Sequence, residues 1–138
     1  MTVVLDTNVV SAIMQRDPIA LDRLRDERPG DVLLCAPVAA EIHFGLLRLP
    51  DGKRKRLLDG EYQRLRGLLR WVDWTEPSAR EFGQQKARLE AKGQLIEDMD
   101  IAIGSVAHSL GARLATRNVR HMRRLEGLLV EDWSASRG

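Results

Sequence analysis

The chain has 138 residues, of which 43% are hydrophobic and 30% are charged, with a formal net charge of +2. This length and balance fit one soluble domain with a sizeable core, and the single cysteine, Cys35, excludes an internal disulfide or a thiolate metal cluster within the chain. No segment approaches the roughly 18 apolar residues of a membrane-spanning helix and no export signal opens the chain, so we expect a cytoplasmic protein without membrane contact.

Short apolar stretches alternate with segments of helical periodicity along the chain. Strands are predicted at 3–5, 31–37, 70–74, 112–116 and 127–133. Two helices are predicted after each of the first three strands, at 9–15 and 18–28, at 38–49 and 57–69, and at 75–92 and 97–110. One helix is predicted at 119–125, between the last two strands. We therefore predict one α/β domain over residues 1–138, with a doubly wound parallel sheet of four to five strands flanked by helices. A flexible tail is expected at 133–138.

The first strand ends in Asp6-Thr7-Asn8, and this run has two interpretations. Asp and Asn favour turns and helix N-caps, where a side-chain oxygen accepts a hydrogen bond from a free backbone N–H. The carboxyl ends of strands are also where open α/β sheets bind their ligands, and Thr116 ends a later strand at the same edge. Both interpretations can hold for Asp6, because one carboxylate oxygen can cap the helix while the other binds a cation.

Further acidic residues stand at comparable ends of other elements. Glu41 opens the helix after the second strand, and Asp98 and Asp100 open the helix before the strand at 112–116. At about 100° per residue, this helix has an apolar face with Asp100 at its edge, whereas Asp98 points away with Ser105 and Ser109. The apolar face is predicted to consist of Met99, Ile103, Val106, Ala107 and Leu110. We therefore predict that Asp100 is the half-buried carboxylate and that Asp98 is an N-cap or an outer acid.

Carboxylates gathered in one cleft repel one another and need a compensating positive charge. Oxygen ligands without a thiolate pair favour Mg²⁺, for which Mn²⁺ can substitute, over Zn²⁺. Such an ion can polarise a phosphodiester and lower the pKa of a bound water. The acidic residues therefore indicate a candidate phosphoryl-hydrolysing site.

Four blocks of the sequence, in order and at family-like separations, resemble the PIN-domain ribonucleases, and among them the VapC-like toxins of bacterial toxin–antitoxin pairs. The blocks are VVLDTNVVS, APVAAEIHFGL, LIEDMDIAIGSVAHSLG, and LATRNVRHM with the closing VEDW. The resemblance covers residues 3–133 and implies a PIN-like sheet. It also implies that Asp6, Glu41 and Asp100 are catalytic metal ligands, with Asp6 and Asp100 as the main metal residues.

By the same resemblance, Thr7 and Asn8 hold the loop around Asp6, and Thr116 with Asn118 completes the site. The fourth block contains no carboxylate, whereas family members often have one there. We therefore expect one firmly held ion, with Asn118 or a water in place of the missing acid. His121 supplies a neutral ligand or a proton-transfer group in one interpretation and lies on the surface in another. Asn118 can equally be the N-cap of the helix that follows it.

The resemblance also implies an RNA substrate, a VapB-like antitoxin that inserts a segment into the acidic cleft, a homodimer, and a heterotetramer or larger assembly with the antitoxin. The stretch Gly52–Arg56 (GKRKR) and the later Arg64, Arg66 and Arg70 put positive charge on the outer face of one helix. This charge can bind phosphates, although a solvated helix face explains it equally well.

Two other functions fit parts of the sequence. One is an RNA- or antitoxin-binding module without turnover, which the missing fourth acid favours. The other is an aspartate-dependent phosphatase with Asp6 as nucleophile, since such folds also carry an Asp after the first strand. That site normally has a second acid two residues later, where this chain has Asn8, and a Lys after a later strand, which is absent after the strand at 112–116.

Overall fold

A computed structural model describes residues 1–137 of the chain, and its centre is a sheet of five parallel strands. The strands are β1 (Val3–Leu5), β2 (Val32–Cys35), β3 (Arg70–Val72), β4 (Arg113–Thr116) and β5 (Val130–Asp132). Their order in the sheet is β3-β2-β1-β4-β5, and every neighbouring pair is parallel. The predicted single α/β domain with a doubly wound parallel sheet is confirmed.

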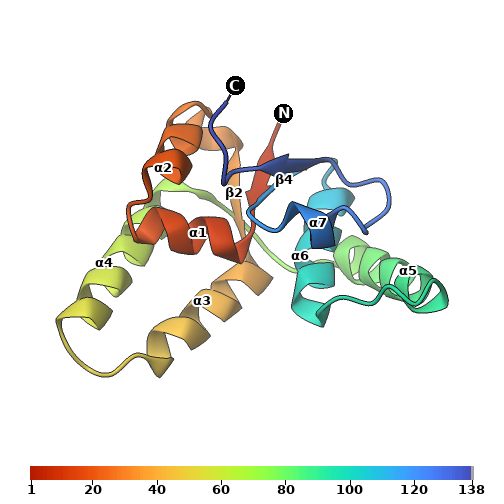
Figure 1. Ribbon diagram of the computed structural model, residues 1–138, viewed down its shortest axis with the longest axis horizontal. Coiled ribbons are helices and arrows are strands. Elements are labelled where there is room, and N and C mark those ends of the chain that lie inside the picture. Colours follow the sequence, from red (N-terminus) through yellow and green to blue (C-terminus); the bar gives the residue numbers. More distant parts are fainter. Residues whose placement is uncertain (138) are drawn as a thin grey trace.

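Seven α-helices in residues 1–137 flank this sheet (Figure 1). They are α1 (Thr7–Met14), α2 (Pro18–Arg25), α3 (Ala36–Arg48), α4 (Lys53–Leu68), α5 (Glu76–Ala91), α6 (Asp98–Ser109) and α7 (Val119–Met122), and a 3₁₀ turn covers Pro29–Asp31. Side-chain oxygens cap the beginnings of two of these helices, with Asp17 at α2 and Thr75 at α5. None of the helices in the described residues has the length and apolar character needed to cross a membrane.

Several helix bounds differ from the prediction. Helix α1 begins at Thr7 rather than residue 9, because Asp6 caps it directly. Helix α4 begins at Lys53 rather than 57, since its first turn, KRKR, is polar and carries no apolar periodicity that would reveal it. Helix α7 ends at Met122 rather than 125.

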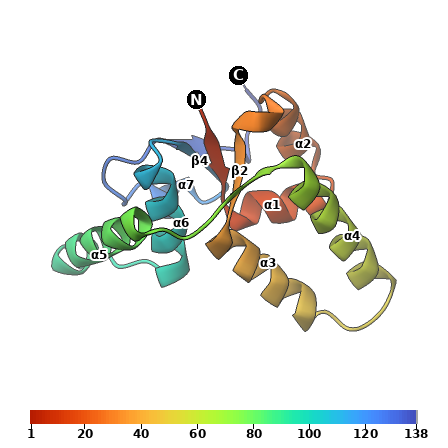
Figure 2. The same ribbon diagram turned by 180° about the vertical axis from the view of Figure 1, so that it is seen from behind.

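The order in which the chain adds strands to the sheet reverses at β1. From β1 the chain builds outward to β2 and β3, then returns to the other side of β1 for β4 and β5. In open α/β sheets such a switch point leaves a crevice at the carboxyl ends of the two strands beside it, which here are β1 and β4. Figures 1 and 2 show the beginnings of α1 and α3 close to this end of β1 and β2.

Helix α6 is buried more completely than predicted. All seven residues from Ile101 to Ala107 are buried, including Ser105, whose hydroxyl donates to the carbonyl oxygen of Ile101 at 2.6 Å. Leu110, predicted on the apolar face, is 48% exposed because the helix has ended at Ser109. The two-sided pattern fails because α6 packs against α5, α3, α7 and the strands β1 and β4, so it has no solvent face in its middle.

The predicted tail at 133–138 begins one residue too early, because Trp133 belongs to the core. Its side chain is 1% exposed, and its indole N–H donates to Glu131 Oε1 at 3.2 Å. Its backbone N–H donates to the carbonyl oxygen of Thr116 at 2.9 Å, which fastens the end of β5 to the end of β4. Gly138 lies outside the described residues.

We expect Trp133→Ala to lower the free energy of unfolding by about 3–5 kcal/mol, because it leaves a large cavity in the core. The matched control is a chain that ends after Trp133, which should melt within about 0.5 kcal/mol of the natural chain. Urea denaturation followed by circular dichroism measures both. A tail removal that destabilises as much as the Trp133 substitution would contradict this boundary.

Candidate functional site

Asp6 lies at the switch point, fixed to both strands beside it. It caps α1, with Oδ1 accepting from the backbone N–H of Thr7 at 2.8 Å. Its Oδ2 accepts from the hydroxyl of Thr116 at 2.7 Å, and its backbone N–H donates to the carbonyl oxygen of Ala115 at 2.8 Å. The side chain is only 3% exposed. Asp6 is therefore the N-cap that the sequence indicated, and a hydrogen bond from β4 fixes its second oxygen.

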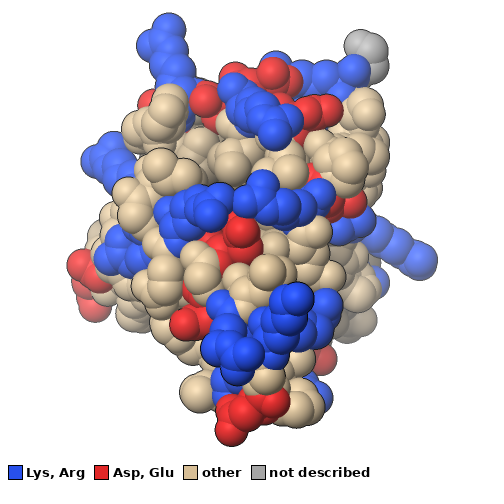
Figure 3. All heavy atoms as spheres, turned by 90° about the vertical axis from the view of Figure 1, so that its left-hand side faces the viewer, with Lys and Arg blue, Asp and Glu red and all other residues tan. Residues whose placement is uncertain are grey.

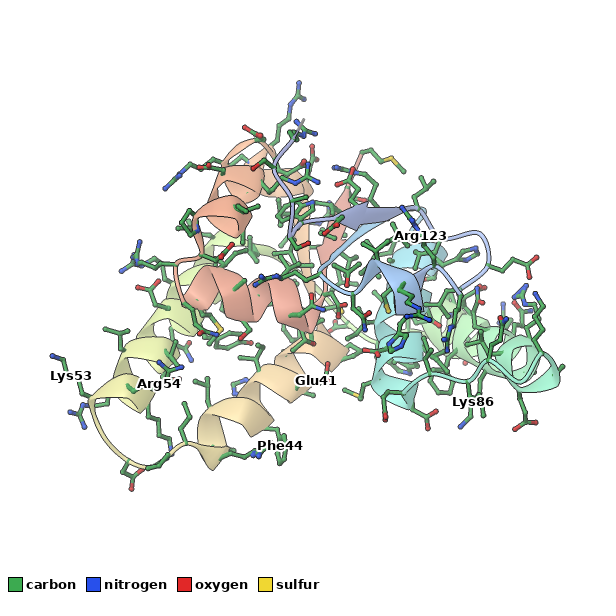
Figure 4. All side chains as sticks on the ribbon, viewed as in Figure 1. Glu41, Phe44, Lys53, Arg54, Lys86 and Arg123 are labelled. Carbon is green, nitrogen blue, oxygen red and sulfur yellow. The ribbon has the colours of Figure 1, made fainter. Side chains whose placement is uncertain are left out.

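Glu41 approaches the same end of the sheet from α3. This helix begins directly after β2, and Figure 4 shows Glu41 on the part of α3 that is nearer to α1. The hydroxyl of Thr7 donates to Glu41 Oε1 at 2.5 Å. Thr7 thus links the acid of α3 to the N-cap of α1, a contact that the sequence analysis missed because it assigned Thr7 only to the loop around Asp6.

Asp100 and Asp98 separate as the helical geometry predicted, although the first of the two roles predicted for Asp98, the N-cap of the helix, is wrong. Asp100 is half-buried in the first turn of α6. Asp98 is exposed and pairs with Lys86 of α5 at 3.0 Å, and Figure 4 shows Lys86 well away from Glu41. The N-cap position of α6 belongs to Glu97, without a side-chain hydrogen bond. Asp98 therefore neither caps the helix nor belongs to the buried acids.

The turn after β4 is held by polar side chains from two elements. Asn8 Oδ1 accepts from the backbone N–H of Arg117 at 3.0 Å, so Asn8 fastens this turn rather than the loop around Asp6. Asn118 occupies the N-cap position of α7 but makes no capping bond, and its Nδ2 lies 2.9 Å from Nδ1 of His121. The backbone N–H of Asn118 donates to Oγ1 of Thr116 at 2.9 Å. The hydroxyl of Thr116 therefore connects this turn to Asp6.

Burial and mutual repulsion perturb the acids in the same direction. Burial raises the pKa of Asp6 from 3.8 to about 6, against the lowering effect of the hydrogen bonds from Thr116 and Thr7, and the charges of Asp100 and Glu41 raise it further. The pKa of Asp100 is also raised, first by burial and then by the charge of Glu41, while His121 acts in the opposite direction. The three acids are thus close enough to influence one another.

No group of three or more His, Cys, Asp or Glu side chains within residues 1–137 forms a ready-made metal cage. The donor set nevertheless fits a magnesium-like ion, which is usually held by one or two carboxylates, while waters and substrate phosphates complete its octahedral shell. Asp6 keeps free lone pairs on both carboxylate oxygens after its two hydrogen bonds. A cation near Asp6 and Asp100 would also offset the cost of keeping both charged.

The raised pKa of Asp6 predicts that the metal-free chain loses stability as pH rises. Its carboxyl binds a proton more tightly in the folded state, so the stabilisation is complete below pH 3.8 and is lost as pH rises through about 6. Between about pH 5 and 7.5 we expect a loss of roughly 1 kcal/mol. Glu27 and Asp132 have lowered pKa values, so their contributions change only at more acidic pH.

Thermal melts in EDTA at several pH values measure this loss, and Asp6→Asn provides the control because its side chain cannot ionise. The dependence on pH should be clearly flatter in that variant. A natural chain that becomes more stable over this range would contradict the assignment of a buried, repelled carboxylate.

The hydroxyl of Thr7 predicts a second measurable effect. Thr7→Val keeps the shape of the side chain but removes the donor to Glu41, and we expect Mn²⁺ affinity in calorimetric titration to fall about tenfold. Thr7→Ser restores the hydroxyl and should bind Mn²⁺ nearly as the natural chain does. Equal affinities for the Val and Ser variants would show that the contact does not position Glu41.

Comparison with known proteins agrees with this geometry. Residues 3–128 match the family model of the PIN domain. The chain is 30% identical over 123 residues to VapC ribonuclease Y4jK of Sinorhizobium fredii, covering 84% of this chain and 86% of that protein. It is 28% identical over 129 residues to ribonuclease VapC2 of Haemophilus influenzae, covering 94% of this chain and 96% of that protein.

The fold is also similar to that of a solved complex. A chain in the crystal structure of VapBC2 from Rickettsia felis, bound to a DNA fragment from their promoter, superposes with a TM-score of 0.84 at 25% identity. The match covers 96% of this chain and 99% of that one. The strand order, the acids at the switch point and the length of these matches agree, and the chain therefore belongs to the PIN-domain family and groups with its VapC members.

Proposed function

We propose that this chain is a metal-dependent endoribonuclease toxin that hydrolyses RNA phosphodiesters and is neutralised by a VapB-like antitoxin. The observation that carries the proposal is the linkage at the switch point of a PIN-domain sheet, where Thr7 connects the cap by Asp6 with Glu41 and the charges of Glu41 and Asp100 both act on Asp6. The names of the relatives support the reaction, since those proteins are called VapC ribonucleases.

In this proposal Asp6 and Asp100 hold a Mg²⁺ ion, which Mn²⁺ can replace, and Glu41 completes the set of catalytic acids. A bound divalent cation would supply Lewis acidity toward the phosphodiester and a lower pKa for an attacking water. Glu41 would act as the general base, and the hydroxyl of Thr7 holds the orientation of its carboxylate. Thr116 keeps one oxygen of Asp6 directed at β4.

The turn after β4 has a supporting role in this proposal. Asn8 and Thr116 hold the backbone of Arg117 and Asn118 in place. The contact between Asn118 and His121 fixes the ring of His121, which leaves its Nε2 free to act on a substrate oxygen or a leaving group. Asp98 is assigned no catalytic role in this proposal, because it is exposed and pairs with Lys86 rather than with the buried acids.

An RNA substrate is supported by the charge on α4. Figure 3 shows Lys and Arg side chains spread over the side of the molecule that this helix covers, with acidic residues between them. Part of this charge is neutralised within the protein, since Lys55 pairs with Asp51 and Arg64 lies 3.9 Å from Glu61. Arg66 stacks over Trp71 at 4.3 Å. Lys53, Arg54 and Arg56 are exposed and remain available to bind phosphates.

The antitoxin partner is supported by the VapBC2 complex of Rickettsia felis, which shares this fold. A basic antitoxin side chain inserted among the acids would take the position of the cation and relieve the same repulsion. A homodimer, and a heterotetramer or larger assembly with the antitoxin, follow from the family resemblance and belong to this proposal.

A binding module without turnover is the second candidate. It is favoured by the fourth block of the sequence, Thr116–Met122, which lacks the additional acid that family members often carry. The aspartate-dependent phosphatase is less well supported, because both oxygens of Asp6 accept hydrogen bonds and neither Asn8 nor Arg117 offers the required acid or Lys.

The decisive measurement is RNA cleavage by the purified chain with Mn²⁺ and with EDTA. Asp6→Asn and Asp100→Asn should each lower the rate by about a hundredfold or more, because each removes a charged metal ligand. Asp98→Asn is the matched control on the same helix and should stay within about threefold of the natural chain. Equal losses at 98 and 100 would contradict the site, and no metal-dependent cleavage by the natural chain would favour the binding module.

A further inference from the structure

A cavity lies between the start of α6 and the segment that runs from α7 to Arg124. It has a volume of about 540 Å³ and is lined by Leu95, Ile96, Glu97, Asp98, His121 and Arg124. The lining comes from the segment that leads into the first turn of α6 and from α7 with the residues after it; Asp100 lies in the same turn of α6, and Asn118 directly precedes α7. The cavity can therefore hold the part of a bound substrate that continues beyond the reacting group.

Hydrogen bonds connect this cavity with the buried acid. His121 in the lining contacts Asn118 at 2.9 Å, and the backbone N–H of Asn118 donates to Thr116 Oγ1. Thr116 in turn donates to Asp6 at 2.7 Å. The charge of His121 also acts on Asp100. A ligand in the cavity would therefore contact His121, which these hydrogen bonds connect with Asp6.

Basic and acidic side chains line opposite sides of the cavity. Arg124 and His121 line it from the α7 side, and Glu97 and Asp98 line it from the α6 side. Asp98 is already paired with Lys86, whereas Arg124 and its neighbour Arg120 have no carboxylate within ion-pair distance among residues 1–137. Within residues 1–137, the one hydrogen bond of the Arg124 guanidinium is a long one, 3.5 Å to the carbonyl oxygen of Gln94. Its positive charge is available to an anionic group.

An apolar surface lies next to this charge. Leu95 is 47% exposed and Ile96 is partly buried, so the segment before α6 presents an uncovered apolar face to the cavity. A flat base can cover such a face while its polar edge meets Glu97. A nucleotide has both features, a phosphate for the positive side and a base for the apolar side. A basic antitoxin segment, which the acids would attract, would instead meet the like charge of the unpaired Arg124.

We infer that this cavity is the subsite for one nucleotide of single-stranded RNA next to the phosphate that is cut. Arg124 binds its phosphate, with Arg120 nearby, and Leu95 contacts its base. The inference rests on the proposed ribonuclease function and adds to it the path of the substrate across α7. Arg124 is a substrate-binding residue in this scheme and takes no part in the reaction itself.

Fluorescence anisotropy with a short fluorescein-labelled single-stranded RNA of mixed sequence tests the subsite. The full chain is titrated in Ca²⁺ at several salt concentrations. Arg124→Gln should raise Kd about tenfold and reduce the slope of log Kd against log salt by about 0.7, as expected for the loss of one phosphate contact on a single strand. The matched control is Arg28→Gln, an exposed Arg at the opposite, amino-terminal end of β2, which should change neither quantity.

The base contact is tested separately. Leu95→Ser should raise Kd about threefold without altering the salt slope, because it removes apolar contact and no charge. Leu68→Ser is its control, since Leu68 is 62% exposed at the end of α4 and lines a different pocket. Circular dichroism melts confirm that all four variants fold.

Equal effects of Arg124→Gln and Arg28→Gln on Kd and the salt slope would overturn the subsite, and so would no effect of Arg124→Gln. So would a substitution that loosens only the complex with the antitoxin, because the cavity would then be a protein-docking site. The proposed function fails independently, if the natural chain binds this RNA but does not cut it with Mn²⁺.

Discussion

The hydrogen bond from Thr116 to Asp6 is the contact on which the candidate site depends, because it joins the ends of β4 and β1 across the switch point of the sheet. Asp6 would otherwise be a buried carboxylate with a single capping bond. The hydroxyl of Thr116 serves three groups at once, since it also accepts from Asn118 and lies 3.5 Å from the amide nitrogen of Asn8. One small side chain thus fixes the acid and the turn that follows β4.

This arrangement sets stability against function. The free energy of folding would improve if the acids at the end of the sheet were farther apart or more exposed, since burial and mutual repulsion both raise the pKa of Asp6. The chain instead keeps them close and orients them with Thr7 and Thr116, hydroxyls that add no charge. Buried acids that repel one another in this way would be stabilised by the cation of the proposed function, and such perturbed carboxylates are typical of functional sites rather than of structural cores.

The sequence was sufficient for the sheet, the cap by Asp6 and the separation of Asp100 from Asp98, because strand alternation, capping and helical periodicity are local rules. The sequence was insufficient for contacts between residues that are distant in the chain. The pairing of Asp98 with Lys86, the link from Thr7 to Glu41 and the burial of Trp133 each join segments whose contact no local pattern reports. The two-sided pattern of α6 failed for a related reason, since neighbours surround that helix.

The central position of β1 has a consequence for biosynthesis. Asp6 emerges first from the ribosome, yet its partner Thr116 lies 110 residues later in the chain. Long-range pairing of this kind is slow to form and cannot precede the synthesis of both strands. A polypeptide that stops before β4 carries Asp6, Glu41 and Asp100 but lacks the strand that aligns them. Interrupted translation therefore yields fragments in which the acids of the candidate site are not assembled, and only the nearly finished chain can form it.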